Sequence, residues 1–460
     1  MNSPVFPPPA AVRADVTAAV AEAAAGIGYH SLPPEVVTTV KRVLADTLAV
    51  AWAAGEAAGV PAARAWALRG GAGQGRLWGQ GEARREPAAA AFFNGTLAAA
   101  LDFDSLAGQV HADAVVAPAA VAVAEDAGRS GRDLIAALAL GAELTIRLAA
   151  ASHSNTGWFH TSIAGVFGAA LAAGRLRGLD AGRLHNALGI ALCQAGGTQQ
   201  SHVEQRLTKR LQSAFAARDG VVSADLAGLD ITGPQAAFEG PFGLYALFEQ
   251  GRADLVLDGF GSRYLLLDTA LKRYPACGCS HAALEAAAAL VRTHGLRPDD
   301  VARGEIVITP YMARLVGGAF APEANPQVTG QFNVRYGVAA TVLRGGFSLA
   351  DIEPGAVLDP AVRPLVERLS VRVDESRTGR FGPSDVTFET DDGRRLHHSV
   401  AELPGSPAAP LSDAEHHAKL IGAFTHGPGA LTAAQAEALI ARVHRLEAVA
   451  DVSTLFTRIR

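Results

Sequence analysis

Apolar residues recur every three or four positions through most of the first 260 residues, with breaks at Gly, Asp or Pro. This spacing is typical of helices that bury one face. It predicts helical structure nearly throughout residues 10–258. The clearest predicted helices are 34–54, 87–101, 117–127, 131–151, 160–175, 181–195 and 210–229.

The pattern changes after about residue 265. Alternating or β-branched runs at 305–309, 369–373, 386–390 and 394–400 predict strands, and Asp391-Asp392-Gly393 predicts a hairpin turn between the last two. Helical spacing returns at 280–294, 333–344, 412–424 and 432–448. We therefore expect a mainly α fold, in which residues 1–265 and 405–460 form a large all-helical domain. Residues 266–404 form a smaller α+β domain.

Composition excludes several classes of protein. Of the 460 residues 49% are hydrophobic and 18% charged, and the net charge is −5, which excludes a disordered chain and argues against a nucleic-acid partner. Three cysteines cannot form a disulfide framework. The segment 1–9 lacks signal-peptide character, and the longest apolar runs are about half the length of a membrane span. We expect a cytoplasmic protein without a membrane partner.

Lysine is rare in this chain. Only Lys41, Lys209, Lys272 and Lys419 occur among 40 basic residues. Arginine stays protonated, whereas a buried lysine can shift its pKa and move a proton, so a retained lysine is a candidate for chemistry. Lys41 and Lys419 lie in amphipathic helical segments with polar neighbours, so we expect both at the surface.

Four short segments concentrate titratable residues within apolar sequence. The first ends a helix in two carboxylates and then presents a histidine, and the second places a histidine at a helix N-terminus, where bound anions are favoured. The other two are Lys-Arg pairs, the second followed by a histidine. In order, the four segments hold Asp102, Asp104 and His111; His160; Lys209 and Arg210; Lys272, Arg273 and His281.

Each segment taken alone also has a structural explanation. A histidine before a helix can be a cap, two aspartates can end a helix in solvent, and a Lys-Arg pair can lie at the surface. Metal binding is disfavoured because no metal-ligand spacing recurs on one helical face. The pairs His397-His398 and His416-His417 are expected at exposed positions.

The order and spacing of these segments resemble the MmgE/PrpD family, which includes 2-methylcitrate dehydratases, cis-aconitate decarboxylases and iminodisuccinate epimerases. The resemblance runs through nearly the whole chain. Its motifs are Ala45-Asp46-Thr47-Leu48, Asn94-Gly95 with Asp102-Phe103-Asp104 and His111, Gly157 with His160-Thr161-Ser162, Thr208-Lys209-Arg210-Leu211, Gly233-Pro234 with Glu239-Gly240 and Gly243, Lys272-Arg273-Tyr274-Pro275 with His281, and Gln331-Phe332-Asn333-Val334-Arg335-Tyr336-Gly337.

The resemblance implies a helical domain with an α+β lid, a homodimer, and an active site between the domains that needs no metal or organic cofactor. It also implies the residues of that site. Catalytic candidates are His111, His160, Lys209, Lys272 and Asp104, and candidates for substrate binding are Asp102, Thr161, Arg210, Arg273, His281 and Tyr336.

A small carboxylate is the expected substrate, because local cations can hold it while a histidine moves a proton beside the carboxylate. We expect a lyase that dehydrates a hydroxy-polycarboxylate, as 2-methylcitrate dehydratases do. The alternatives are decarboxylation of a cis-aconitate-like acid, epimerisation of an iminodisuccinate-like diacid, and a non-catalytic binding protein.

Two departures from the family pattern leave the substrate open, including acids other than 2-methylcitrate and cis-aconitate. Ala112-Asp113 follows His111 where proline and a small residue are common, and no proline separates His160 from Thr161. The carboxylate of Asp113 also adds a negative charge next to the expected site.

Overall fold

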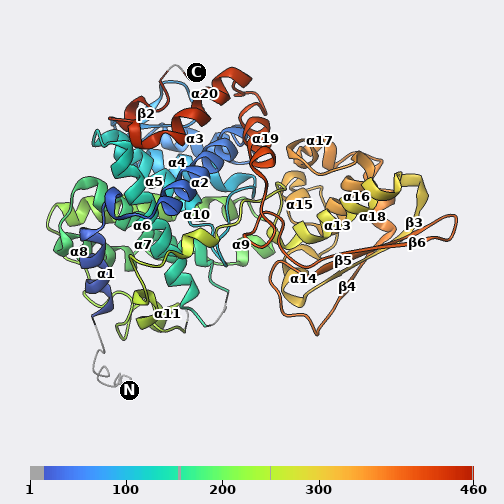
Figure 1. The fold of residues 1–460 in the computed structure, drawn as a ribbon, viewed down its shortest axis with the longest axis horizontal. Coiled ribbons are helices and arrows are strands. Elements are labelled where there is room, and N and C mark those ends of the chain that lie inside the picture. Colours follow the sequence, from blue (N-terminus) through green and yellow to red (C-terminus); the bar gives the residue numbers. More distant parts are fainter. Residues whose placement is uncertain (1–14, 154–156, 249, 458, 460) are drawn as a thin grey trace.

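The computed structural model describes residues 15–153, 157–248, 250–457 and 459. The segment 1–9, on which the expectation of no signal peptide depends, lies outside the described residues. Most of the described chain is helical and only short strands occur in it, which confirms the expectation of a mainly α fold. Figure 1 shows a large helical lobe beside a smaller lobe that contains helices and a sheet.

The helical lobe is built mainly from the first half of the chain. Its helices pack through Ala- and Gly-rich faces, and α10 lies against both α4 and α7. The helices are α1 (Val16–Gly26), α2 (Pro34–Ala53), α3 (Val60–Ala67), α4 (Pro87–Ala100), α5 (Asp113–Asp126), α6 (Gly131–Ala150), α7 (His160–Arg177), α8 (Ala181–Leu192), α9 (Gln200–Val203), α10 (Thr208–Gly228), α11 (Leu244–Leu247) and α12 (Asp254–Leu257).

Small residues set how closely these helices approach one another. A Cβ atom built on Gly168 in α7 would lie 2.3 Å from the carbonyl oxygen of Gly141 in α6, and one on Gly95 in α4 would lie 2.9 Å from the Cα of Ala214 in α10. Such distances leave no room for a side chain, so glycine at these two positions permits the backbone contact.

The smaller lobe contains a four-stranded sheet with the order β4-β3-β5-β6. Strand β3 pairs in parallel with β4 and antiparallel with β5, and the hairpin of β5 and β6 turns at Gly393, which has a φ of 84°. The elements are α13 (Gly278–His294), β3 (Val301–Ile308), α14 (Pro310–Val316), α15 (Pro326–Gln331), α16 (Val334–Arg344), α17 (Pro354–Val357), α18 (Val362–Glu367), β4 (Leu369–Val373), β5 (Ser384–Thr390) and β6 (Arg395–Val400).

The chain then returns to the helical lobe through α19 (Asp413–Phe424) and α20 (Ala433–His444), both of which pack against α2 (Figure 1). Each of the two helices begins with a capping box, at Ser412 with Glu415 and at Thr432 with Gln435. Helix α19 brings Lys419 over α2, so a segment near the C-terminus reaches the centre of the molecule. Across the described residues, the search for a helix with the length and apolar character of a membrane span finds none.

Two expectations about single residues are wrong. The side chain of Lys419 is buried, with 5% of it exposed, and His416 is also buried. Both residues face α2, where Asp46 accepts from Lys419 and contacts the His416 ring, so the polar residues of this amphipathic segment make a buried cluster. His417, His397 and His398 are exposed as expected.

Candidate active site

The site is built around a tight turn after α4. This turn, residues 102–106, is called the carboxylate turn below because it carries Asp102 and Asp104. Asp102 has a φ of 50°, a left-handed conformation that is uncommon for aspartate and persists where surrounding contacts hold it. Both aspartates are buried, so their charges require partners.

Two lysines share the carboxylate of Asp102. Lys209 comes from the first turn of α10, and its Nζ donates to Oδ1. Lys272 comes from the segment before α13, and its Nζ lies 2.9 Å from Oδ2 and 2.7 Å from the backbone oxygen of Asp102. Burial by itself would raise the pKa of Asp102. The charges of Lys209 and Lys272 lower this pKa by more than burial raises it, so it lies well below the ordinary range. Asp102 is therefore ionised at neutral pH.

Lys272 is itself fully buried. Burial lowers its pKa, but the carboxylates of Asp102 and Asp104 raise it above the ordinary value. Asp104 Oδ1 lies 3.9 Å from the Lys272 Nζ. Lys272 is thus a charged ammonium in an interior position, and its raised pKa does not favour the proton transfer that its retention in an arginine-rich chain suggested.

The second aspartate holds His111. The Nδ1 of His111 lies 3.0 Å from Asp104 Oδ2 and 2.9 Å from the backbone oxygen of Ser105, and both of these atoms are acceptors. Nδ1 therefore carries a hydrogen, and Nε2 is the nitrogen left to exchange a proton with a ligand. The backbone N–H of His111 donates to the Thr161 hydroxyl, which fixes the loop to the start of α7.

Asp102, Lys209 and His111 border a narrow cavity of about 50 Å³, whereas Asp104 and Lys272 contact these residues without lining it. Its polar lining includes Asp102, His111, Gln199, His202 and Lys209. The rest of its wall is largely apolar or carries thiols, and comprises Leu106, Phe159, Cys277, Cys279, Leu315, Phe332 and Phe381 among others. This combination of one lysine, two histidines and apolar surface suits a small anion.

Three buried polar atoms at this cavity have no hydrogen-bond partner among the described residues. They are Oε1 of Gln109, Oε1 of Gln199 and Nε2 of His202. Burial, with Lys209 nearby, lowers the pKa of His202 to about 4, so the His202 ring is neutral. Buried polar groups are nearly always satisfied in native proteins, so these atoms indicate that the cavity receives a polar ligand or water.

Several residues expected at the site lie around it and not on the cavity wall. His160 is the buried first residue of α7, next to Thr161. Arg210 is buried one residue after Lys209 and donates to the Ala58 carbonyl, Gln327 and Gln331. These residues connect α10 and α7 to the site.

The remaining expected residues have structural partners. His281 Nε2 lies 3.1 Å from the Ala276 oxygen, and burial, with Lys272 nearby, lowers the pKa of His281 to about 3. The Tyr336 hydroxyl donates to the Asp351 carbonyl. Asp113, expected to add charge to the site, accepts instead from the Ser105 hydroxyl, and burial raises its pKa to about 6.

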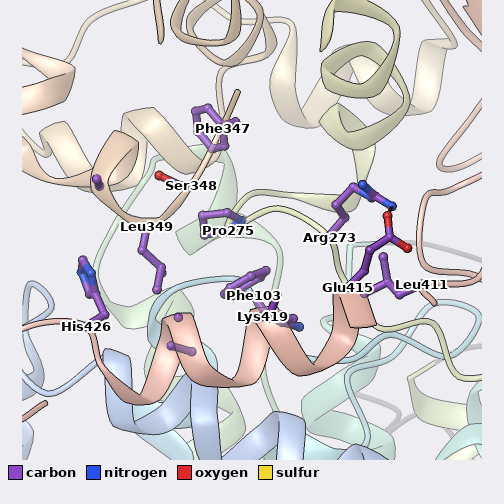
Figure 2. A pocket seen from close by; sticks show the side chains of 14 residues that line it. Phe103, Arg273, Pro275, Phe347, Ser348, Leu349, Leu411, Glu415, Lys419 and His426 are labelled. Atoms are coloured by element: carbon purple, nitrogen blue, oxygen red, sulfur yellow. Dashed lines mark hydrogen bonds and ion pairs between the residues drawn. The ribbon is translucent and has the colours of Figure 1, made fainter. Parts of the chain in front are cut away.

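Arg273 lines a different cavity. This larger cavity, of about 450 Å³, lies between α19 and residues 347–350 of the smaller lobe (Figure 2). Arg273 pairs there with Glu415 and lies 3.6 Å from Glu285, so its charge is compensated. Phe103 and Lys419 also line this cavity, whereas the adjacent Asp102 lines the small one. Consecutive residues of the carboxylate turn therefore face two cavities.

Sequence reasoning missed part of the small cavity. It singled out neither His202 nor Gln199, which lie in and before the short helix α9 without a recognisable motif. It considered the cysteines only by their number, yet Cys277 and Cys279 both line the cavity. Across the described residues, no three His, Cys, Asp or Glu side chains converge as a set that could hold a metal ion.

Comparison with known proteins finds one family across both lobes. Residues 18–255 match the MmgE/PrpD N-terminal domain and residues 274–447 match the MmgE/PrpD C-terminal domain. A cis-aconitate decarboxylase-like protein of Aspergillus oryzae, oryM, is 30% identical over 363 residues, covering 72% of this chain and 74% of its own. The human cis-aconitate decarboxylase is 28% identical, covering 84% and 82%. That of Aspergillus terreus is 26% identical, covering 85% and 86%.

Proposed function

The chain belongs to the MmgE/PrpD family, and from that premise we propose that it is a carboxy-lyase that decarboxylates cis-aconitate or a closely similar tricarboxylate. The expectation of a lyase is confirmed at the level of class, because the relatives described above are named for decarboxylation. The substrate is the new element of the proposal. One structural observation carries it: Lys209 and a carboxylate-bound histidine line one narrow cavity, and Asp102 joins Lys209 to a second, buried lysine, Lys272.

The reaction needs one proton and no oxidant. A proton adds to the CH carbon of the alkene, the one not attached to the methylene group, while the bond from the methylene carbon to its carboxylate breaks. The electron pair of that bond becomes the new double bond, and carbon dioxide leaves. Cis-aconitate and a proton thereby give methylenesuccinate and carbon dioxide, so atoms and charge balance.

His111 is the proposed proton donor. Asp104 and the Ser105 oxygen hold its Nδ1–H, so the Nε2 side can deliver the proton once the ring is charged. Asp104 then stabilises the imidazolium and fixes the orientation of the ring, as a carboxylate does for histidine in other acid–base sites.

Lys209 and Lys272 are the proposed carboxylate-binding groups. Their ammonium groups share Asp102, so a substrate carboxylate can replace part of that contact without bringing unpaired charge into the interior. The apolar wall formed by side chains such as Phe332 and Phe381 would surround the carboxylate that leaves as a neutral molecule. Removing water from that carboxylate favours its loss.

Dehydration of a hydroxy-polycarboxylate, which the sequence analysis preferred, uses the same proton-transfer and cation groups. Epimerisation of a diacid does so too. The three reactions differ in what leaves the substrate, and they are therefore separated by product and not by site composition.

Proton NMR in deuterium oxide tests the proposal, with cis-aconitate, 2-methylcitrate, citrate and iminodisuccinate offered separately. We expect methylenesuccinate carrying one deuteron from cis-aconitate, with release of carbon dioxide. A new alkene from 2-methylcitrate or citrate without loss of carbon dioxide would replace the proposal by a dehydratase. Deuterium exchange into iminodisuccinate alone would replace it by an epimerase.

The homodimer and the independence from cofactors stay predictions. Light scattering after size-exclusion chromatography measures the first. Activity that survives dialysis against a chelator, assayed with and without added divalent metal, measures the second.

A further inference from the structure

The carboxylate turn is held by three side chains that each donate to one of its backbone carbonyl groups. Lys272 donates to the oxygen of Asp102, Lys419 donates to the oxygen of Phe103 at 3.1 Å, and His111 donates to the oxygen of Ser105. Lys272 and His111 belong to the candidate active site. Lys419 does not line that cavity and comes from α19, more than 300 positions further along the chain.

Lys419 contacts Phe103 in two ways. Its Nζ lies 4.1 Å from the centre of the Phe103 ring as well as binding the carbonyl. Figure 2 shows the two side chains together beside α19, at the larger cavity. A cation over an aromatic face adds attraction to the hydrogen bond, so the position of Phe103 is fixed at both its backbone and its ring.

Asp46 fixes Lys419 in turn. The Lys419 Nζ lies 2.7 Å from Asp46 Oδ1 and 2.9 Å from Oδ2, and Asp46 is completely buried in α2. His416 Nε2 lies 3.3 Å from the same carboxylate. Burial raises the pKa of Asp46, but Lys419 and His416 bring it below the ordinary value, so the carboxylate is ionised.

We propose that Lys419, anchored by Asp46, is a positioning residue that holds the carboxylate turn so that Asp102 and Asp104 meet the lysines and the histidine of the active site. The left-handed φ of Asp102 needs such support, because a strained residue persists only where its surroundings determine its conformation. Phe103 lies between the two aspartates, so a shift of its carbonyl moves both carboxylates. The kinetic part of this inference rests on the proposed function, and its spectroscopic part does not.

The test must separate positioning from stability. Removing Lys419 alone would leave the Asp46 carboxylate buried with reduced compensation, and such a change destabilises a protein whatever its activity. The double variant Asp46→Asn/Lys419→Met removes both charges together and keeps similar volumes. Lys41→Met is the matched control, because Lys41 also bridges α2 to the C-terminal helical region, through Glu447, and its hydrogen bonds among the described residues go to that region and not to the carboxylate turn.

In the kinetic arm, we expect the double variant to lose about tenfold to a hundredfold in kcat on cis-aconitate, with a smaller change in KM. Its melting temperature should stay close to that of the parent. Lys41→Met should keep the parent kcat. A double variant with parent stability and parent kcat would overturn the proposal.

The spectroscopic arm uses the rarity of lysine. Lysine labelled with ¹³C at Cε gives signals from only four side chains, which single lysine substitutions assign. In the double variant we expect the signals of Lys209 and Lys272 to shift, because Asp102 moves relative to both, and in Lys41→Met we expect them to stay. Unchanged Lys209 and Lys272 signals in a folded double variant would also overturn the proposal.

A second variant covers the case in which the double variant does not fold. Asp46→Asn is nearly isosteric and weakens the anchor of Lys419, together with the contact to His416, while keeping the lysine. We expect the Lys419, Lys209 and Lys272 signals to shift together. A shift of the Lys419 signal alone would show that its anchor does not control the carboxylate turn. If the parent protein turns over none of the acids, the proposed function fails, while the spectroscopic arm still decides the positioning role.

Discussion

Asp102 receives two ammonium groups from helices and segments that are far apart in the chain, and this is the contact on which the proposed chemistry depends. Lys209 and Lys272 lie in different segments of the chain, so only the fold brings both of them to Asp102. Lys272 differs from Lys209 in being completely buried and in also approaching Asp104. Its charge therefore acts on both carboxylates of the turn.

Replacing Lys272 by methionine should abolish most turnover. The methionine fills similar space but cannot stabilise charge on a substrate carboxylate, and losing one such donor lowers kcat by about 10²–10³-fold. Initial rates on cis-aconitate by NMR measure the effect, with circular dichroism to confirm folding. Lys41→Met is the control and should retain full activity. Parent-like rates in a folded Lys272→Met variant would contradict the assigned role.

A second prediction concerns a buried carboxylate outside the site. Glu125 in α5 accepts from the backbone N–H of Arg76 at 2.7 Å, and burial raises its pKa to about 7 from 4.5. Between these values the folded state binds more protons than the unfolded state, so the free energy of unfolding falls as pH rises through this range. Above pH 7 the folded state carries the full free-energy cost of burying the ionised Glu125 carboxylate.

Glu125→Gln should remove that penalty. We expect the variant to be more stable than the parent by about 2–3 kcal/mol at pH 8, with the difference vanishing near pH 4.5. Urea unfolding at several pH values measures it. The exposed Glu82, which pairs with the same Arg76, provides the control Glu82→Gln, whose effect should be small. A stability gain for Glu125→Gln that did not change with pH would refute the explanation.

At the residue scale, the sequence singled out the residues at the centre of the candidate site more readily than those around it. Lys209, Lys272, Asp102, Asp104 and His111 were singled out and the structure brings them together. These residues carry local signals, namely a rare residue type or charge within apolar sequence.

The supporting residues carry no such signal. Lys419 lies in an amphipathic helix with polar neighbours, which is also the pattern of a surface helix, and only the return of α19 onto α2 buries it. Gln199 and His202 reach the cavity through the placement of one short helix. Tertiary packing places these side chains, and the spacing of apolar residues along the chain carries no information about that packing.

At the scale of elements, periodicity predicted the helices well because most of them bury an apolar face. The prediction for 131–151 corresponds to α6, Gly131–Ala150, and the predicted hairpin corresponds to β5 and β6. It missed the small pair β1 (Gly75–Arg76) and β2 (Arg84–Arg85), because strands of two residues with arginine in them show no alternation. Helix α5 begins at Asp113, four residues before the predicted start.

The contact between α6 and α7 leads to a prediction at this scale. A Cβ atom on Gly168 would lie 2.0 Å from the Thr145 hydroxyl and 2.3 Å from the Gly141 oxygen, whereas one on Gly422 in α19 meets nothing within 4 Å. Gly168→Ala should destabilise the protein by about 1–3 kcal/mol because the helices must separate. Gly422→Ala should stabilise it by about 0.5–1 kcal/mol.

Thermal unfolding of the two variants beside the parent measures both effects. The substitution is the same in each variant, so the change in helix propensity is the same. Any difference in stability between the two variants then comes from the space around the added Cβ atom. Two variants that shifted the melting temperature in the same direction would contradict the packing explanation.

At the scale of the whole molecule, the candidate site is narrow. Its cavity of about 50 Å³ has room for a few water molecules at about 10–15 Å³ each, and a tricarboxylate is larger than that. The wall combines residues of the helical lobe, such as His111 and Lys209, with Tyr311 and Phe381 of the smaller lobe. We therefore expect the two lobes to move apart at this wall when substrate enters.

The three cysteines report on that movement. Cys277 and Cys279 are buried at the cavity, whereas Cys193 is exposed in the same molecule and serves as an internal reference. With a maleimide probe and mass spectrometry of the peptides, we expect Cys193 to react first and the cavity pair at least about tenfold more slowly. A non-reacting tricarboxylate such as tricarballylate should slow the cavity pair further and leave Cys193 unchanged, because a bound anion holds the lobes together across Lys209 and Lys272. Equal rates at all three thiols would mean that the wall is open in solution, and substrate entry would then need no movement of the lobes.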